Sequence, residues 1–314
     1  MTGSRVVAVG HHQPARVVPN SELEKLVETN DEWIRTRVGI VERRWAAPEE
    51  TVDVMATKAA EDVLAKAQMT ADQIDTVIVA TCSALDRSPN MAARVANRLQ
   101  MTHNPATIDV NTACSGFPYS LAMAQHAIMA GSSRNALVIG AEKLTDVTDF
   151  TDRTTCVLTA DGAGAMIVTA SEEDGISPVL WGSMPNLGDA VRIEHANDDK
   201  FAQNGQTVFK WTIAELPRIA AEVLEKAGVA PSELGAIVLH QANLRIIEPL
   251  ARKLGADNAV VATDVTESGN TSAASIPLAL SKLLEKQSLP SGTPILLFAF
   301  GGGLSYAGQV IQAP

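Results

Sequence analysis

The sequence predicts an α/β fold built from two duplicated halves. Two observations support this prediction: strand and helix patterns alternate along the chain, and one helix–turn–strand unit occurs twice. Residues 60–79 align without gaps with residues 220–239, an offset close to half of the 314-residue chain. Such an offset is typical of a duplicated fold. We therefore expect an N-terminal half at residues 1–170 and a C-terminal half at residues 171–314.

Each copy of the repeat has the pattern of an amphipathic helix, a short polar turn and a β-branched strand. In the first copy, Thr70 and Gln73 have the spacing of a capping box. A chance match between two Ala-rich helices is the alternative, and the shared register of helix and strand argues against it. The identical pairs are Ala60/Ala220, Val63/Val223, Leu64/Leu224, Lys66/Lys226 and Ala67/Ala227.

The other elements follow from short β-branched runs and from helical periodicity. Strands are predicted at Val6–Val9, Val77–Ala80, Ala136–Ile139, Gly164–Val168, Ile237–Leu239 and Ile295–Phe298. Helices are predicted at Thr51–Ala67, Ser115–Ala130, Ile213–Ala227, Arg245–Leu254 and Ala274–Lys286. Residues 171–207 are the least regular, and we expect them to cap the functional site or to join the halves.

Composition and charge narrow the functional classes. Hydrophobic residues make up 46% of the chain and charged residues 19%, which is typical of a globular protein with large cores. The net charge of −11 argues against binding to nucleic acid or to an anionic membrane. Three cysteines, an odd number, do not form a disulfide framework and indicate a reducing cytoplasm. No apolar run approaches the roughly 18 residues of a membrane span, so we expect a soluble protein.

Cys114 is the principal candidate for a nucleophile. It follows the apolar segment Thr107–Val110 and precedes the predicted helix from Ser115, so its sulfur lies at a helix N-terminus. Free backbone N–H groups and the helix dipole there favour the thiolate. His240 follows a predicted strand and Asn270 precedes a predicted helix, and such positions in two similar halves can converge. A thiolate, an imidazole and a carboxamide predict an acyl-transfer site. The other cysteines, Cys82 and Cys156, lack this context and are assigned to packing.

The motifs around these residues resemble those of β-ketoacyl-acyl carrier protein synthase III, a family of thiolase-like condensing enzymes. The matching segments occur in the family's order over nearly the whole chain. They are Asp31–Ile34, Ala113–Phe117, Thr151–Arg153, Asp161–Gly164, Val208–Lys210, His240–Asn243, Gly269–Ser275 and Gly301–Gly303. The resemblance implies a five-layered αβαβα fold made of two duplicated halves, and a homodimer.

The resemblance also implies a reaction, a decarboxylative Claisen condensation that initiates fatty-acid synthesis. Cys114 would accept the acyl group of an acyl-CoA, and malonyl-acyl carrier protein would be the second substrate. His240 and Asn270 would donate hydrogen bonds to the enolate oxygen that forms on decarboxylation. The backbone N–H groups of Cys114 and Gly302 would form the oxyanion hole. Both thioesters are substrates, so we expect no metal and no separate cofactor.

Binding residues are assigned by the same resemblance. The residues expected to hold CoA, by stacking and by charge pairing, are Trp33, Arg37 and Arg153. Those expected in the substrate channel are Ser88, Thr159, Gln206, Phe209 and Asn243. The carrier protein is acidic in these pathways and this chain is acidic too, so docking requires a local basic patch. Its candidates are Arg245, Arg252 and Lys253.

Two departures from the family pattern bear on the acyl group. Ser88 stands before Pro89 where many members have Phe, and Thr159-Ala160 replaces a frequent Phe-Gly pair. Smaller side chains leave room for a longer or branched starter. One alternative is a pathway-specific acyltransferase or a condensing enzyme of polyketide or other secondary metabolism. Remoter alternatives are a cysteine hydrolase, whose Cys-Gly-Ser-Cys-Trp signature is absent, and a non-catalytic scaffold, which would not require all three site residues.

Overall fold

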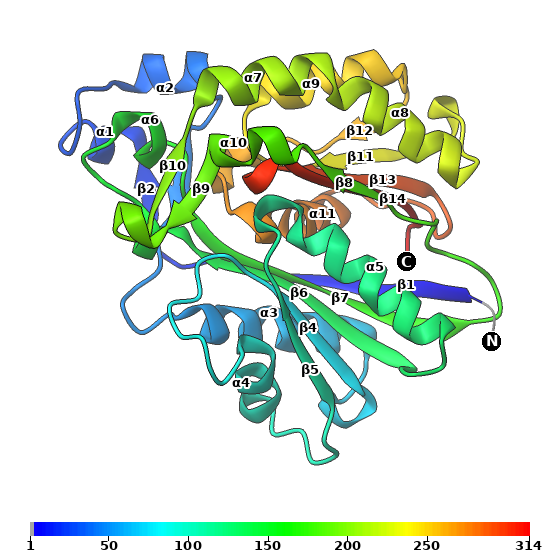
Figure 1. Cartoon of the computed structure of the whole chain (residues 1–314). Coiled ribbons are helices and arrows are strands. Elements are labelled where there is room, and N and C mark those ends of the chain that lie inside the picture. Colours follow the sequence, from blue (N-terminus) through cyan, green and yellow to red (C-terminus); the bar gives the residue numbers. More distant parts are fainter. Residues whose placement is uncertain (1–2) are drawn as a thin grey trace.

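A computed structural model describes residues 3–314, which form the predicted five-layered αβαβα arrangement. Two five-stranded sheets each carry helices on their outer face. Between the sheets lie α5 (Gly116–Met129) and α11 (Ser275–Lys286), as Figure 1 shows. Among residues 3–314, no helix is both long enough and apolar enough to cross a membrane.

The two sheets have the same topology. The first has the order β5 (Ala106–Val110), β4 (Thr76–Ala80), β6 (Asn135–Lys143), β7 (Asp161–Ser171) and β1 (Gly3–His12). The second has the order β12 (Val260–Val261), β11 (Ala236–Leu239), β13 (Pro294–Phe300), β14 (Ser305–Gln312) and β8 (Leu180–Ser183). In each sheet the first three strands are parallel, and the last two pairings are antiparallel. The predicted duplication is therefore confirmed by the order and direction of the strands.

The repeated segment folds alike in both halves. The outer helices α3 (Val52–Ala67) and α8 (Leu216–Ala227) end at equivalent residues. The Thr70 N–H donates to Gln73 Oε1 at 2.8 Å, and the Ala230 N–H donates to Glu233 Oε2 at 2.6 Å. These bonds form the same turn before β4 and before β11. We propose the boundary of the halves between residues 170 and 171, next to the last residue of β7, Ser171.

One predicted helix is wrong. Residues 213–227 do not form a single helix, since α7 (Gly205–Ala214) ends before Glu215 and α8 begins at Leu216. Pro217 explains the break, because proline has no backbone N–H for a continuing helix but fits the first turn of a new one.

Short elements that the sequence patterns did not predict lie mostly around the site. The strands are β2 (Val17–Pro19), β3 (Glu42–Arg44), β9 (Val191–Glu194) and β10 (Lys200–Gln203). The helices are α1 (Asn20–Leu23), α2 (Asp31–Arg37), α4 (Met91–Arg98), α6 (Arg153–Cys156) and α10 (Val265–Ser268). The helix predicted at Arg245–Leu254 is α9 (Leu244–Leu254), which is one residue longer than predicted. Strands β9 and β10 pair as an antiparallel hairpin within the irregular stretch.

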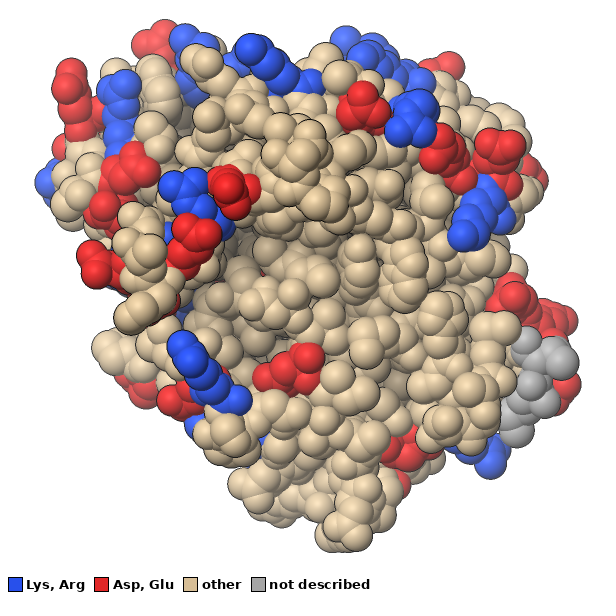
Figure 2. Space-filling model, in the orientation of Figure 1, with Lys and Arg blue, Asp and Glu red and all other residues tan. Residues whose placement is uncertain are grey.

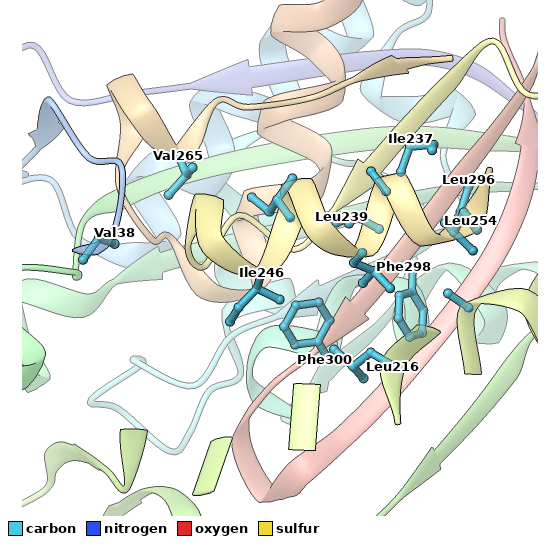
Figure 3. Close-up of a cluster of buried hydrophobic side chains, with 14 of the residues drawn as sticks. Val38, Leu216, Ile237, Leu239, Ile246, Leu254, Val265, Leu296, Phe298 and Phe300 are labelled. Carbon is cyan, nitrogen blue, oxygen red and sulfur yellow. The ribbon is translucent and has the colours of Figure 1, made fainter. Parts of the chain in front are cut away.

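Both faces of the second sheet are buried. Along β13, Leu296, Phe298 and Phe300 pack in the cluster beneath α9 that Figure 3 shows, with Ile246 and Leu254 of that helix. The alternate residues of β13 belong to the cluster around the central helices. Burying one such side chain contributes about 1.5–3 kcal/mol, so the sheet ends that carry the site are firmly held.

Candidate active site

A cavity of about 330 Å³ brings together four residues that the sequence predicted, Cys114, Thr159, Asn270 and Gly302. It lies where the ends of strands from both halves meet the N-terminal ends of α5 and α11. The remaining lining residues are Cys82, Asn111, Thr112, Ala113, Leu144, Val191, Arg192, Ile193, Phe201, Ser272 and Gly303.

Close backbone approach places Cys114 against the glycine run. Cys114 lies in a short 3-10 turn directly before α5, and the preceding Ala113 has a left-handed φ of 47°. A Cβ atom on Gly301 would lie 2.7 Å from the Cys114 sulfur, and one on Gly302 would lie 2.5 Å from the Ala113 Cβ. The glycines are therefore required for this contact. The Gly302 N–H and the Ser272 hydroxyl lie beside the Cys114 sulfur, where both lower its pKa.

The position of Cys114 before a helix N-terminus does not ionise its thiol. Burial raises its pKa, and this effect outweighs the opposing hydrogen bonds from Ser272 and Gly302. The expectation that the helix N-terminus gives a resting thiolate is thus wrong, because the sulfur is removed from water. A neutral thiol must lose its proton during the reaction.

His240 is a buried, neutral imidazole behind the cavity. It follows β11, is 2% exposed, and its ring meets Phe300 edge-on with 5.6 Å between the ring centroids. Its Nδ1 lies 2.8 Å from Ser275 Oγ, which leaves Nε2 for a substrate. Burial lowers the His240 pKa to about 3, so the ring is uncharged at neutral pH. His240 does not itself line the cavity, although Phe300 directly precedes the glycine run that does.

Asn270 is fixed by its own backbone. Its N–H donates to the Leu158 carbonyl and its carbonyl accepts from the Ala160 N–H, both at 2.9 Å, which holds it beside Thr159. Its side-chain Oδ1 accepts the Ser272 N–H at 2.9 Å. The side-chain oxygen is therefore occupied, and the NH₂ group is the free donor.

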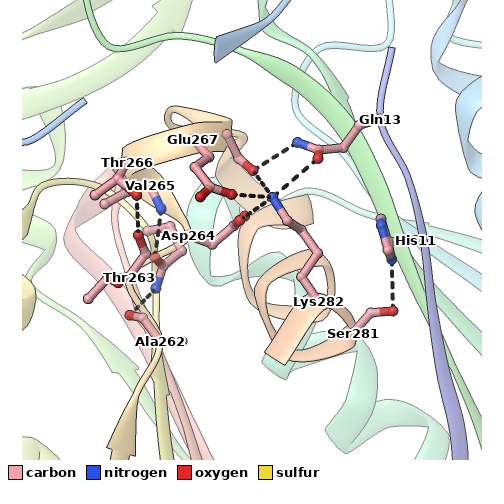
Figure 4. A network of polar contacts seen from close by, with 12 residues as sticks. His11, Gln13, Ala262, Thr263, Asp264, Val265, Thr266, Glu267, Ser281 and Lys282 are labelled. Atoms are coloured by element: carbon pink, nitrogen blue, oxygen red, sulfur yellow. Dashed lines mark hydrogen bonds and ion pairs between the residues drawn. The ribbon is translucent and has the colours of Figure 1, made fainter. Parts of the chain in front are cut away.

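A polar network secures the segment that precedes Asn270 (Figure 4). Lys282 of α11 forms an ion pair with Asp264 at 2.5 Å, just before α10. Gln241, the residue after His240, accepts the Val265 N–H at 2.9 Å. These contacts join the loop after β11 to the loop before α11, which fixes the positions of His240 and Asn270 relative to each other.

The residues expected to hold CoA lie outside the cavity. The Arg153 guanidinium lies 5.1 Å from the centre of the Trp33 ring, and its Nη1 donates to the Glu28 carbonyl at 2.9 Å. Arg37 is exposed and lies four residues after Trp33 on α2. Asn243 caps α9 and donates to the Arg37 carbonyl at 3.1 Å, so it joins α2 to α9.

The basic candidates for docking are exposed on α9. The Arg245 guanidinium lies 5.4 Å from the centre of the Phe209 ring of α7, while Arg252 and Lys253 lie near the other end of α9. Figure 2 shows Lys and Arg side chains along the edge of the molecule formed by α7 and α9. None of these three basic residues lines the cavity.

The channel residues are only partly brought together. Thr159 lines the cavity and is 1% exposed, whereas Ser88, Gln206, Phe209 and Asn243 do not line it. The hairpin residues Val191, Ile193 and Phe201, which the sequence reasoning missed, lie there instead. Their only signal was a weak alternation of apolar residues in an irregular stretch.

Cys82, which the sequence analysis assigned to packing, lies at the cavity. Its side chain lines the cavity, and its sulfur lies 3.6 Å from Ser272 Oγ. The internal repeat could have indicated this position. Cys82 follows β4, and β4 is the counterpart of β11, the strand that precedes His240.

Comparison with known proteins agrees with this geometry. Residues 108–185 match the family model of 3-oxoacyl-[acyl-carrier-protein] synthase III, and residues 224–313 match the model of its C-terminal part. The chain is 58% identical to β-ketoacyl-[acyl-carrier-protein] synthase III 4 of Streptomyces coelicolor, over 99% of both chains. It is 59% identical to β-ketoacyl-[acyl-carrier-protein] synthase III 2 of Streptomyces avermitilis, over the full length of both.

Solved structures share the whole fold. The priming β-ketosynthase of the R1128 polyketide pathway superposes with a TM-score of 0.96 at 38% identity, covering 99% of this chain and 96% of that one. The 3-oxoacyl-[acyl-carrier-protein] synthase III of Aquifex aeolicus superposes with a TM-score of 0.93 at 39% identity, covering 99% and 100%. From this agreement over the full length, the chain belongs to the β-ketoacyl-[acyl-carrier-protein] synthase III family, whose members are thiolase-like condensing enzymes and acyltransferases.

Proposed function

We propose that this chain catalyses the decarboxylative condensation of an acyl-CoA with malonyl-acyl carrier protein and so initiates fatty-acid synthesis. The observation that carries the proposal is the meeting of Cys114, Asn270 and the Gly302 N–H at one cavity. Full-length similarity to two Streptomyces synthases supports the same reaction.

In the first half-reaction, the Cys114 sulfur attacks the thioester carbonyl carbon of the acyl-CoA. The carbonyl oxygen becomes an oxyanion, which accepts the backbone N–H groups of Cys114 and Gly302. The C–S bond to CoA then breaks, and CoA leaves as a thiol with the proton that Cys114 loses.

In the second half-reaction, the bond between the malonyl methylene and its carboxylate breaks, and CO₂ leaves. The electron pair forms an enolate, whose oxygen receives hydrogen bonds from His240 Nε2 and the Asn270 NH₂ group. The Gln241 N–H donates to Ser275 Oγ at 3.3 Å, so the hydroxyl hydrogen is directed to His240 Nδ1 and Nε2 carries the ring proton. The enolate carbon attacks the acyl group on Cys114, and the sulfur leaves.

Separate assays of the two half-reactions test this division of roles. Asn270→Ala removes one enolate donor, so we expect release of CO₂ from malonyl-acyl carrier protein to fall by about 10²–10³-fold. Acylation of Cys114 in the same variant should change by less than about 10-fold. Equal loss of both half-reactions, or loss of neither, would contradict the assigned role.

We propose that the protein acts as a homodimer. Strand β5 is an edge strand, since β4 is its only hydrogen-bonded neighbour among the described strands. Figure 2 shows that the centre of the same face, over α5 and β8, carries few charged side chains. Exposed apolar residues on these elements include Ile108, Met129 and Trp181. Pairing of two β5 strands would cover this edge and extend the sheet across the dimer.

A second candidate is a condensing enzyme that primes a specialised pathway. The superposition on a priming β-ketosynthase of a polyketide pathway favours it, and the chemistry at Cys114 would be the same. Parallel assays with acyl carrier proteins of fatty-acid and of polyketide synthesis distinguish the two. The proposed function predicts the higher kcat/KM with the acyl carrier protein of fatty-acid synthesis.

We also infer a cytoplasmic location, supported by three free cysteines.

A further inference from the structure

A carboxylate outside the predicted site is completely buried at the junction of the two halves. Glu142 lies near the end of β6, has no exposed surface, and forms no ion pair with any residue in the described range 3–314. Burial raises its pKa, and the surrounding hydrogen bonds oppose that effect. Burying a carboxylate without a cation costs free energy, and the hydrogen bonds that Glu142 accepts offset this cost.

All the polar contacts of Glu142 are with donors. From the segment after β4 they are the Thr81 hydroxyl at 3.1 Å, the Cys82 N–H at 3.1 Å, the Cys82 thiol at 3.3 Å, the Ser83 N–H at 3.1 Å and the Ser83 hydroxyl at 2.5 Å. From the turn before α11 it accepts the Ala273 N–H at 3.3 Å. One carboxylate therefore binds a loop of the N-terminal half and a turn of the C-terminal half.

Both segments carry residues of the cavity. Cys82 belongs to the first and Ser272 to the second, and their side chains meet at 3.6 Å. Ser272 also lies beside the Cys114 sulfur, whose pKa it lowers, and its N–H donates to Asn270 Oδ1 at 2.9 Å. The contacts thus run from Glu142, through one residue on each segment, to the nucleophile and to the proposed enolate donor.

Strand β6 and this turn are also in close backbone contact. A Cβ atom on Gly140 would lie 2.3 Å from the Ala273 carbonyl oxygen. The side-chain contact of Glu142 and the backbone contact of Gly140 both fix the same turn against β6.

We propose that Glu142 is a positioning residue of the condensing site, which holds the Cys82 loop and the Ser272 turn so that Cys114 and Asn270 face the substrate. It acts through these segments and does not touch the substrate. The inference rests on the proposed function, since acyl transfer to Cys114 is its readout.

The test compares Glu142→Gln with Asp75→Asn. Glutamine keeps the shape of Glu142 but places an NH₂ group among donors, so the loop and the turn must shift. Asp75 is the matched control, because it accepts the Arg134 N–H at 2.8 Å and the Ser133 hydroxyl at 2.5 Å at the opposite ends of β4 and β6. Acylation of Cys114 by acetyl-CoA is followed by intact mass, together with KM and the thermal midpoint.

We expect Glu142→Gln to lower the rate constant of Cys114 acylation by about 10–100-fold, with KM for acetyl-CoA changed by less than about 3-fold. Asp75→Asn should lower the thermal midpoint but keep the acylation rate constant. A wild-type rate in Glu142→Gln, an equal loss in Asp75→Asn, or a change in KM alone overturns the inference.

A further variant covers the case in which Glu142→Gln does not fold. Ser83→Ala removes the shortest contact of Glu142 and keeps the carboxylate. It should lower the rate constant of Cys114 acylation, but by less than Glu142→Gln. A wild-type rate in Ser83→Ala overturns the inference. A wild-type protein that is never acylated on Cys114 would instead refute the proposed function, so the two failures are distinct.

Discussion

At the scale of single residues, burial sets the protonation of both groups that acyl transfer needs. The thiol of Cys114 has a raised pKa and the imidazole of His240 a lowered one, so both are neutral at pH 7. A neutral thiol must lose its proton as the sulfur attacks the thioester, whereas a thiolate would be ready beforehand. The raised pKa of Cys114 therefore argues against a preformed thiolate.

The pKa of His240 predicts how stability depends on pH. Its value is about 3 in the folded chain and 6.5 in the unfolded chain, so the unfolded state binds the proton first as the pH falls. The free energy of unfolding should consequently decrease below pH 6.5 and continue to decrease toward pH 3. Between pH 7 and pH 5 we expect the wild type to lose about 2 kcal/mol more than His240→Gln, measured by urea unfolding. Equal losses in both proteins would show that His240 is not buried as described.

The sequence could identify residues but not their environments. Cys114, His240 and Asn270 were found from motifs, and the structure places Cys114 and His240 after strands of the two sheets and Asn270 in the turn before α11. The direction of the Cys114 pKa shift was predicted wrongly, because desolvation depends on what packs above the sulfur. Cys82 was missed for a related reason, since its contact with Ser272 joins residues that are far apart in the chain.

At the scale of elements, the glycine run acts as a spacer between Cys114 and the second sheet. Gly302→Ala would place a Cβ atom 2.5 Å from the Ala113 Cβ and move the N–H that faces the sulfur. We expect the rate constant of acylation to fall by about 10²-fold or more, measured by rapid-quench mass spectrometry. Gly205→Ala is the control, because no atom lies within 4 Å of its added Cβ. A wild-type rate for Gly302→Ala would remove Gly302 from the oxyanion hole.

The β9–β10 hairpin is the element that should select the acyl chain. Phe201, Val191 and Ile193 line the cavity, so Phe201→Ala enlarges the space next to Cys114. We expect the ratio of kcat/KM for octanoyl-CoA to that for acetyl-CoA to rise by about 10-fold. Gln203→Ala on the same strand, whose side chain donates to the Thr154 carbonyl, should leave the ratio unchanged. An unaltered ratio in Phe201→Ala would place the acyl chain elsewhere.

Strand and helix patterns predicted the regular core but not this hairpin. β13 is buried on both faces and has a continuous apolar run, which marks it in the sequence. β9 and β10 are short and half-exposed, so their apolar residues do not stand out. The break between α7 and α8 was missed because helical periodicity continues across Pro217.

At the scale of the whole molecule, the duplication was predictable because both copies kept their helix, turn and strand in one register. The oligomeric state is harder to predict, since a partner subunit leaves little trace in a single sequence.

The edge strand β5 gives a direct test of the proposed dimer. Ile108→Asp places charge on that edge, so we expect a monomer in sedimentation velocity where the wild type is a dimer. Leu26→Asp, also at an exposed apolar residue, should remain a dimer, and a dimeric Ile108→Asp would contradict this interface.

The central claim is that Cys114 carries the acyl group between the two substrates. Intact-protein mass spectrometry tests it most directly, after incubation with acetyl-, isobutyryl- and octanoyl-CoA and then with malonyl-acyl carrier protein. We predict an acyl adduct on the wild type, none on Cys114→Ala, and discharge of the adduct as β-ketoacyl product. Absence of any adduct, an adduct that persists in Cys114→Ala, or one that malonyl-acyl carrier protein cannot discharge would contradict the claim.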